Sequence, residues 1–254
     1  MTRVVKLGGR AQQDPQLPAA LALLCREWPG RVCLVHGGGD EVSQLQRRMG
    51  MEPRFVGGRR VTSAADLEVV RMVLSGTVNK RLVSALLAHD VDAVGLSGED
   101  AGLLAARPVA REQLGRVGEV TRVEPRVLAH LMAGGFVPVV SPLARDASGG
   151  YGEALNVNGD DAAAALAAAL SADELLFLAD VPGVLADGAV LAQLDVAQAR
   201  ALVADGVAAG GMAAKLQAAH AALASGVGSV RIGDIGAVRD GSRGTRITLS
   251  PSYV

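Results

Sequence analysis

Short apolar runs rich in β-branched residues alternate with longer stretches of helical periodicity along the whole chain. Short runs bounded by turn residues are typical of buried strands. The predicted strands are Arg3–Leu7, Arg31–Val35, Asp92–Leu96, Val137–Ser141, Glu174–Ala179 and Ser229–Ile232. The predicted helices are Gln16–Glu27, Glu41–Met49, Ala64–Leu74, Asn79–His89, Pro125–Gly134, Asp160–Leu170, Val196–Asp205 and Gly211–Ser225. This alternation predicts an α/β protein with a mostly parallel sheet covered by helices.

Two segments, 107–121 and 144–155, break into short glycine-rich pieces that are typical of hairpins. The motifs described below divide between two parts of the chain, which sets a boundary near Ser171. We therefore expect an N-terminal lobe of residues 1–170 and a C-terminal lobe of residues 171–254. A length of 254 residues suits either one large domain or two closely packed lobes.

Composition narrows the possible function classes. Hydrophobic residues make up 50% of the chain and aromatic residues only 2%, so the core must consist mainly of Ala, Val and Leu. The formal net charge is −1 and no run of Lys and Arg forms a stripe, which argues against a nucleic-acid or anionic-membrane surface. No apolar run reaches the roughly 18 residues of a membrane span. A strand at the very start leaves no room for a signal peptide, so a cytoplasmic protein is expected.

Two glycine loops follow predicted strands. Lys6-Leu7-Gly8-Gly9 ends the first strand, and His36-Gly37-Gly38-Gly39 ends the second and leads into a helix. Glycines at such turns let backbone N–H groups approach a ligand, and the helix dipole adds positive potential, so together they suit an anion. Each loop is also compatible with a plain tight turn, and His36 with a packed turn histidine. The Walker-type and dinucleotide glycine fingerprints are absent, so any phosphate must be bound in another way.

Three further polar segments complete the candidate site: Gly58-Arg59-Arg60-Val61-Thr62, Asn156-Val157-Asn158-Gly159-Asp160 and Gly210-Gly211-Met212-Ala213-Ala214-Lys215. An arginine of the first segment suits a bidentate grip on a carboxylate. The second segment places two amides and a carboxylate before an alanine-rich helix, and the third puts a lysine on the first turns of another helix. The alternatives are a helix cap for Asn158 or Asp160 and a solvated surface position for Lys215 and both arginines.

These groups together suit phosphoryl transfer to a carboxylate. Two anions meet in that reaction, and positioned cations and backbone N–H groups offset the charge of the transition state. A carboxylate is already ionised near neutral pH, so no general base is needed. The sequence offers lysines, arginines and glycine N–H groups, and it contains no defensible Ser/His/Asp or Cys/His nucleophile. By themselves, the residues favour a small anionic acid as the acceptor.

At these residues the chain resembles the amino acid kinase family, and within it the acetylglutamate kinases. The resemblance extends over essentially the whole chain, and its specificity lies in the order and spacing of motifs that are individually weak. The motifs are Lys6-Leu7-Gly8-Gly9, His36-Gly37-Gly38-Gly39, Gly58-Arg59-Arg60-Val61-Thr62, Val78-Asn79-Lys80, Gly95-Leu96-Ser97-Gly98, Gly115-Arg116-Val117-Gly118-Glu119, Asn156-Val157-Asn158-Gly159-Asp160, Ala179-Asp180-Val181-Pro182-Gly183, Gly210-Gly211-Met212-Ala213-Ala214-Lys215 and Gly244-Thr245-Arg246-Ile247.

The resemblance implies a three-layer α/β/α sandwich with an open, mainly parallel sheet of about eight strands, similar to carbamate kinases. It also implies ATP-dependent phosphorylation of the side-chain carboxylate of N-acetyl-L-glutamate, in arginine biosynthesis. The acyl substrate would lie on the N-terminal lobe and ATP on the C-terminal lobe. Mg²⁺ would be held mainly by the nucleotide phosphates, without a metal site made by the protein.

The resemblance also implies roles for particular residues. Lys6 and Lys215 would neutralise the transferring phosphoryl group from opposite sides, and Asp160 would hold both lysines in place. The N–H groups of Gly9 and Gly38 would bind phosphoryl oxygens. The acetylglutamate-binding residues would be Gly37, Gly38, Arg60, Asn156 and Asn158, with the arginine on the α-carboxylate. The nucleotide-binding residues would be Lys6, Gly9, Asp180, Gly210, Gly211, Met212 and Lys215.

Arginine-inhibited relatives carry an extra N-terminal helix that links dimers into a hexameric ring. Here the first predicted strand starts at Arg3, so we expect an arginine-insensitive homodimer joined through the N-terminal lobe. One alternative is the related kinase of lysine biosynthesis that acts on aminoadipate or glutamate attached to a carrier protein, which differs around the Arg60 loop. Another alternative is a non-catalytic sensor of amino acids or nucleotides. The presence of Lys6, Asp160 and Lys215 argues against this alternative. Arg59 stands at a usually apolar position and receives no role.

Overall fold

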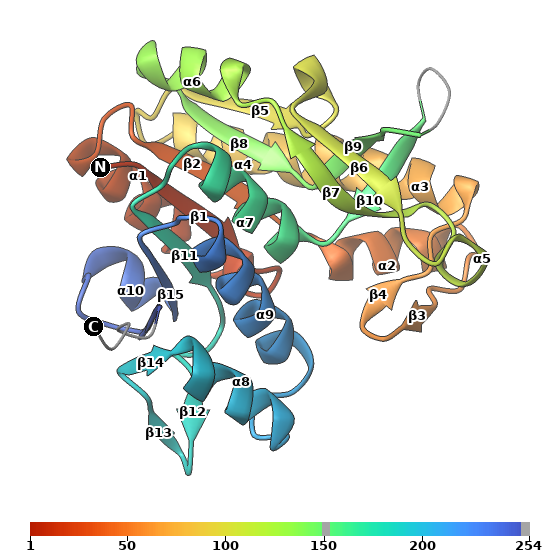
Figure 1. Cartoon of the computed structure of the whole chain (residues 1–254). Coiled ribbons are helices and arrows are strands. Elements are labelled where there is room, and N and C mark those ends of the chain that lie inside the picture. The colour runs from red at the N-terminus through yellow and green to blue at the C-terminus, as the bar shows by residue number, and fades with distance from the viewer. Residues whose placement is uncertain (149–152, 250–254) are drawn as a thin grey trace.

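Eight strands form the central sheet in the computed structural model, which describes residues 1–148 and 153–249 (Figure 1). They are β1 (Arg3–Leu7), β2 (Val32–His36), β5 (Ala93–Ser97), β8 (Val137–Ser141), β11 (Glu174–Leu178), β14 (Gln193–Asp195), β15 (Ser229–Gly233) and β16 (Thr245–Thr248). Their order across the sheet is β14-β16-β15-β11-β1-β2-β8-β5. Neighbouring strands are parallel except β15 and β16, which confirms the predicted mainly parallel sheet.

Helices cover both faces of this sheet and give the expected three-layer arrangement (Figure 1). One face carries α1 (Leu17–Glu27), α2 (Gly39–Arg48), α3 (Ala64–Arg71), α4 (Asn79–Leu87) and α10 (Ile235–Arg239); the other carries α6 (Arg126–Ala133), α7 (Gly159–Ala169), α8 (Val196–Ala204) and α9 (Gly210–Ala224). Successive strand side chains point to opposite faces, so Val5 packs on the α1 side and Val4 on the α7 side. Both cores consist mainly of Ala, Val and Leu, as the composition predicts.

Four more strands close into a small barrel beside α7. They are β6 (Leu104–Pro108), β7 (Val117–Val123), β9 (Leu143–Asp146) and β10 (Ala154–Val157), with the short α5 (Arg111–Leu114) between β6 and β7. The two expected hairpins fall here: β6 pairs antiparallel with β7, and β9 with β10. The parallel pairs β6–β9 and β7–β10 then close the barrel, so each of its four strands, in the described part of the chain, pairs with two neighbours. Residues 149–152 of the second expected hairpin lie outside the described residues.

Several elements differ from the predicted ones. The π-helical segment η2 (Met72–Val78) joins α3 to α4, so the two predicted helices form one continuous helical run. A π-helical segment departs from the 3.6-residue period, which explains why the pattern indicates two separate helices. The strands β14 and β16 were missed because they are only 3 and 4 residues long and partly exposed. Two small hairpins, β3 (Phe55–Val56) with β4 (Arg59–Arg60) and β12 (Leu185–Ala186) with β13 (Ala189–Val190), also lack an apolar run.

The fold brings several chain segments to one edge of the central sheet. β1 lies between β2 and β11, so strands from both sides of Ser171 are direct neighbours. The N-terminus of α7 lies close to the carboxyl ends of β1 and β2, because Gly159 approaches both Lys6 and the carbonyl of His36. Ligand sites in open α/β sheets form at this edge. Within residues 1–148 and 153–249, no helix is both long and apolar enough to cross a membrane.

Candidate active site

Two lysines meet on one buried carboxylate. Lys6 lies near the end of β1, Asp160 in the first turn of α7 and Lys215 in the second turn of α9. The Nζ atom of Lys6 lies 2.8 Å from Oδ1 of Asp160, and Nζ of Lys215 lies 3.2 Å from Oδ2. The chain contains only one other lysine, Lys80. The structure therefore brings together the three charged groups expected from the sequence, although they come from three separate segments.

The charges of this group depend on one another. Burial raises the pKa of Asp160, but Lys6 and Lys215 outweigh burial and hold its pKa below the usual range, so the carboxylate is ionised. Burial lowers the pKa of Lys6, with opposition from Asp160 and a further lowering from Lys215. Two cations around one anion leave a local excess of positive charge. An anion that enters beside the lysines is therefore favoured electrostatically.

The two glycine loops lie next to these lysines. The Gly8 N–H donates to Leu178 O of β11 at 2.9 Å, and a Cβ at Gly8 would lie 2.8 Å from that oxygen, so only glycine fits. A Cβ at Gly37 would lie 3.9 Å from Nζ of Lys6, and a Cβ at Gly38 would lie 2.8 Å from Leu74. Across the described residues, no hydrogen bond uses the Gly9 or Gly38 N–H as donor to another group of the chain. These two N–H groups are thus free to bind an anion.

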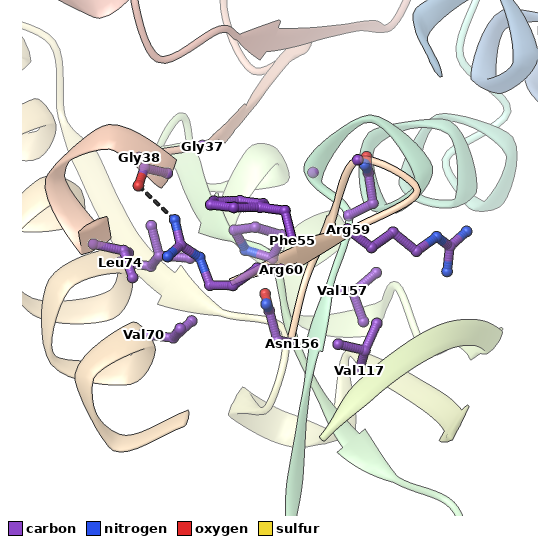
Figure 2. A pocket seen from close by; sticks show the side chains of 16 residues that line it. Gly37, Gly38, Phe55, Arg59, Arg60, Val70, Leu74, Val117, Asn156 and Val157 are labelled. Atoms are coloured by element: carbon purple, nitrogen blue, oxygen red, sulfur yellow. Dashed lines mark hydrogen bonds between the residues drawn. The ribbon is translucent and has the colours of Figure 1, made fainter. Parts of the chain in front are cut away.

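Arg60 lines a pocket beside the second glycine loop (Figure 2). It is buried in β4, where its guanidinium donates to Gly39 O at 2.7 Å, to Ser43 Oγ at 2.8 Å and to Gln46 Oε1. The guanidinium also lies 4.7 Å from the ring centre of Phe55. These contacts fix the orientation of Arg60, and Arg60 donates no hydrogen bond to a carboxylate among the described residues. A carboxylate in the pocket would therefore find a preorganised cation.

Asn156, which Figure 2 labels, lines the same pocket from the strand before α7. Asn158 lines it from the turn that follows this strand. The side-chain amide of Asn156 donates to Thr62 Oγ1 at 3.1 Å. Oδ1 of Asn158 caps α7, accepting from the N–H groups of Asp160 at 2.8 Å and Asp161 at 3.3 Å. The helix cap that the sequence offered as an alternative role is thus present, and it uses only Oδ1 of Asn158. Gly37 and Gly38 of the second glycine loop also line this pocket.

Arg59 does not share the environment of Arg60. Its guanidinium lies 3.6 Å from the carboxylate of Asp161, and both side chains are partly exposed. Burial raises the pKa of Asp161, opposed by Arg59. The pair connects the β3–β4 hairpin to the start of α7. It supplies a contact for a residue to which the sequence assigned no role.

The residues expected to bind the nucleotide are less tightly grouped. Gly210 and Gly211 begin α9 and line a cleft together with Asp160 and Asn158. Gly210 has a φ of +53°, which favours glycine. Met212 is partly buried and packs against the core beside α7. Asp180 lies after β11 and makes an exposed ion pair of 3.2 Å with Arg10.

Comparison with known proteins agrees with this geometry. The profile of the amino acid kinase family matches residues 1–234, which is most of the chain. The chain belongs to the amino acid kinase family. The acetylglutamate kinase of Chloroflexus aurantiacus is 46% identical to it over 247 residues, which cover 96% of each chain. Within the family, the chain is therefore grouped with the acetylglutamate kinases.

Solved structures of other proteins support the same fold. This amino acid kinase is similar to smu.665 from Streptococcus mutans, with a TM-score of 0.87 and 30% identity over 98% of this chain and 99% of that one. It is also similar to a carbamate kinase from Giardia, with a TM-score of 0.75 and 18% identity over 98% and 99% of the two chains. At 18% identity, the similarity to the carbamate kinase is evidence for the fold alone. The predicted carbamate kinase-like architecture is confirmed.

Several polar residues around the site of this kinase received no role from the sequence, although Asn79 is part of the Val78-Asn79-Lys80 motif. Gln46 and Ser43, three residues apart on α2, hold Arg60. Asn79 is fully buried and donates to Nε2 of His36 at 3.1 Å and to Val139 O at 2.9 Å. The motif marks Asn79 in the sequence, but it does not identify His36 as the hydrogen-bond partner.

His36 itself is a fully buried residue of the second glycine loop. Burial lowers its pKa to about 4, so the ring is neutral at neutral pH. Because Asn79 Nδ2 can only donate, Nε2 accepts, and Nδ1 carries the proton and donates to Gly37 O at 2.9 Å. The packed turn histidine considered in the sequence is what the structure contains. Among the described residues, no group of three His, Cys, Asp or Glu side chains could hold a metal ion.

Proposed function

We propose that this chain transfers the γ-phosphoryl group of ATP to the side-chain carboxylate of N-acetyl-L-glutamate. The observation that carries the proposal is the meeting of Lys6 and Lys215 on Asp160 beside two free glycine N–H groups. Little proton chemistry is needed for such a transfer, and the main requirement is positive charge around the phosphoryl group. The 46% identity to an acetylglutamate kinase over 96% of both chains supports the choice of acceptor.

The proposed reaction is a direct in-line displacement. A carboxylate oxygen of the acceptor forms a bond to the γ-phosphorus, the bond from that phosphorus to the β,γ-bridging oxygen breaks, and ADP leaves with the bonding electrons. Lys6 and Lys215 stabilise the charge that spreads over the phosphoryl oxygens, and the Gly9 and Gly38 N–H groups donate to those oxygens. Asp160 keeps the two ammonium groups in position and takes no proton.

The pocket beside the second glycine loop is the proposed acyl site. Arg60 would bind the α-carboxylate, and its fixed orientation supports this role. Asn156, Asn158, Gly37 and Gly38 would contact the remaining polar atoms of the substrate. The acyl site would belong to an N-terminal lobe of residues 1–170.

The nucleotide would occupy a C-terminal lobe of residues 171–254. Gly210, Gly211, Met212 and Asp180 would lie beside it, together with the lysines and Gly9 of the first glycine loop. The positive charge beside Asp160 fits the nucleotide phosphates. Mg²⁺ would be held mainly by those phosphates and would supply further charge neutralisation. Dependence on ATP fits the cytoplasmic location expected from the sequence.

The proposal is tested by ATP turnover against a panel of acceptors: acetylglutamate, glutamate, aspartate, aminoadipate, carbamate and UMP. We expect turnover with acetylglutamate to exceed turnover with every other acceptor. N-Acetylglutamine is the matched control, because it keeps the α-carboxylate and lacks the acceptor oxygen pair. Turnover with aminoadipate or glutamate attached to a carrier protein, but not with free acetylglutamate, would indicate the alternative kinase of lysine biosynthesis. No turnover with any acceptor would indicate a sensor.

We further propose a homodimer joined through the N-terminal lobe and insensitive to arginine. Multi-angle light scattering gives the mass of the particle, and the coupled kinase assay with added arginine gives the inhibition. We expect a dimer with unchanged turnover in millimolar arginine. A ring-sized particle that micromolar arginine inhibits would contradict both parts.

A further inference from the structure

Gln12 connects the two glycine loops. It lies in η1 (Ala11–Gln13), the short turn that follows Gly9, and its side chain reaches across to the second loop. The Nε2 group lies 3.3 Å from Gly8 O and 3.1 Å from Gly37 O, within hydrogen-bond distance of both. It also lies 3.4 Å from Leu7 O. One carboxamide group thus contacts the backbone of both loops.

The two carbonyl groups belong to the peptides that carry the free N–H groups. The carbonyl of Gly8 and the N–H of Gly9 form one peptide unit, and so do the carbonyl of Gly37 and the N–H of Gly38. A trans peptide is planar, and its C=O and N–H bonds point in opposite directions. A donor that fixes the carbonyl therefore also fixes the direction of the N–H group.

The orientation of the Gln12 amide follows from its surroundings. Three carbonyl oxygens face Nε2, and a flipped amide would place Oε1 against the same three oxygens, where two acceptors repel. Within the described residues, Oε1 is buried and has no hydrogen-bond partner. A buried unpaired oxygen is unfavourable for stability. The orientation in which Nε2 faces the loops thus leaves Oε1 buried without a hydrogen bond.

A second donor acts on the Gly37 carbonyl. Nδ1 of His36 donates to it at 2.9 Å, and Asn79 fixes the ring in the tautomer that permits this. The backbone N–H of Gln12 also donates to Gly8 O, at 3.2 Å. Each carbonyl therefore accepts two hydrogen bonds, and the Gln12 side chain is the one group common to both.

We infer that Gln12 is a positioning residue for phosphoryl transfer: its carboxamide holds the Gly8–Gly9 and Gly37–Gly38 peptides so that both N–H groups point at the transferring phosphoryl group. The inference rests on the proposed function and names a residue that deepens it. Gln12 touches neither the substrate nor the nucleotide in this scheme, and it acts only through the two peptides.

Loss of Gln12 should affect the transition state more than substrate binding. The N–H bonds to the phosphoryl oxygens strengthen as charge spreads over those oxygens, so a misaligned N–H lowers kcat more than it raises KM. Loss of one such donor reduces kcat by about 100- to 1,000-fold. In a variant without the Gln12 donor, the Gly9 and Gly38 N–H groups are still present but less well oriented. We therefore expect kcat to decrease by about 10- to 100-fold.

The experiment compares Gln12→Leu with Gln13→Leu. The first change removes the donor and keeps the size of the side chain, and the second makes the same change at the exposed neighbour on the same turn. Steady-state kinetics with acetylglutamate and ATP give kcat and both KM values, and thermal unfolding checks the fold. Gln12→Met serves as a second donor-free variant if the leucine variant does not fold.

We expect kcat to fall in Gln12→Leu with both KM values within about threefold of wild type, a split typical of a lost transition-state interaction. Binding of ADP with aluminium fluoride and acetylglutamate, which mimics the transferring phosphoryl group, should weaken by the same factor as kcat. Binding of a non-hydrolysable ATP analogue should not change. Gln13→Leu should match the wild type in every measurement.

Two results would overturn the inference. One is a Gln12→Leu or Gln12→Met enzyme with wild-type kcat, and the other is a variant whose only defect is a lower unfolding temperature. Failure of the wild-type enzyme to phosphorylate acetylglutamate would instead contradict the proposed function. The wild-type assay therefore distinguishes the two failures.

Discussion

At the scale of single residues, burial of His36 couples the stability of the protein to pH. Burial lowers the pKa of this histidine to about 4, whereas a histidine in the unfolded chain has a pKa of about 6.5. Between these values the unfolded chain binds a proton that the folded protein does not bind. The free energy of unfolding therefore falls as the pH falls from 6.5 to 4, by up to about 3 kcal/mol from this residue.

Urea unfolding at several pH values between 4.5 and 7 measures this effect. We expect the wild-type protein to lose stability on acidification and the His36→Gln protein to show a smaller slope, whatever its stability at pH 7. His130→Gln is the matched control, because His130 is exposed on α6. Equal slopes in the wild type and His36→Gln would show that His36 does not titrate as its burial requires.

Lys215 is the residue whose removal should separate turnover from stability. In Lys215→Ala, Asp160 keeps its 2.8 Å ion pair with Lys6, so no buried charge is left unpaired. We expect kcat to fall by about 100- to 1,000-fold, because one of the two charges proposed to stabilise the phosphoryl group is lost. Lys80→Ala makes the same change at a lysine that contacts Gly95 O instead.

Steady-state kinetics and thermal unfolding of both variants measure the effects on kcat and on stability. The Lys215→Ala protein should unfold within a few degrees of the wild type, and Lys80→Ala should retain turnover. Near-normal turnover in Lys215→Ala would exclude its proposed role.

At the scale of elements, the cap of helix α7 has a structural function and, in the proposed scheme, a substrate-binding function as well. Asn158 Oδ1 accepts from two N–H groups of the first turn, and the residue lines the proposed acyl pocket. Asn158→Asp keeps the capping oxygen, since Asn and Asp are equally good caps, whereas Asn158→Ala loses it at about 1 kcal/mol. Both changes remove the amide donor.

The two variants therefore allow the two functions to be measured separately. We expect only Asn158→Ala to unfold at a lower urea concentration. Both should raise KM for acetylglutamate by about tenfold or more, and the aspartate more, because a hydrogen bond to a charged group is lost and a negative charge is added. An unchanged KM in both variants would remove Asn158 from the acyl site.

At the scale of the whole molecule, the central sheet should make the protein unfold as one unit. β1 and β11 are neighbours in register from Arg3 with Glu174 to Leu7 with Leu178, so strands from both sides of Ser171 share hydrogen bonds. Separation of the two parts would expose the buried faces and edges of both strands. The proposed lobes are therefore parts of one cooperative structure.

Chemical unfolding followed by two probes tests whether the protein unfolds as one unit. Trp28, the only tryptophan, reports on the end of α1, and circular dichroism reports on all helices, including α8 and α9. We expect coincident transitions, and we expect a fragment of residues 1–170 to remain unfolded. Two separated transitions, with circular dichroism retained after the fluorescence change, would indicate independent lobes.

Much of this molecule follows from its local pattern. Apolar runs such as Val137–Ser141 are buried on both faces and give strands with the predicted bounds. Glycines after β1 and β2 are needed where the backbone packs closely, and Asn158 caps α7 as its residue type suggests. These features depend on neighbours within a few positions along the chain, so the order of residues is enough to indicate them.

The contacts between distant segments depend on how strands and helices pack in space. The residues around Lys6 and Lys215 do not by their local pattern indicate that both contact Asp160, and that expectation came only from the resemblance to a family. Nothing near Gln12 indicates that it reaches Gly37, 25 positions away. The closed barrel likewise needs the parallel pairing of β7 with β10. Such pairings depend on strand register and on the angles of crossing helices, which arise from packing of the whole core. The tertiary structure therefore decides which polar groups meet at the site, and the local pattern of the sequence does not show it.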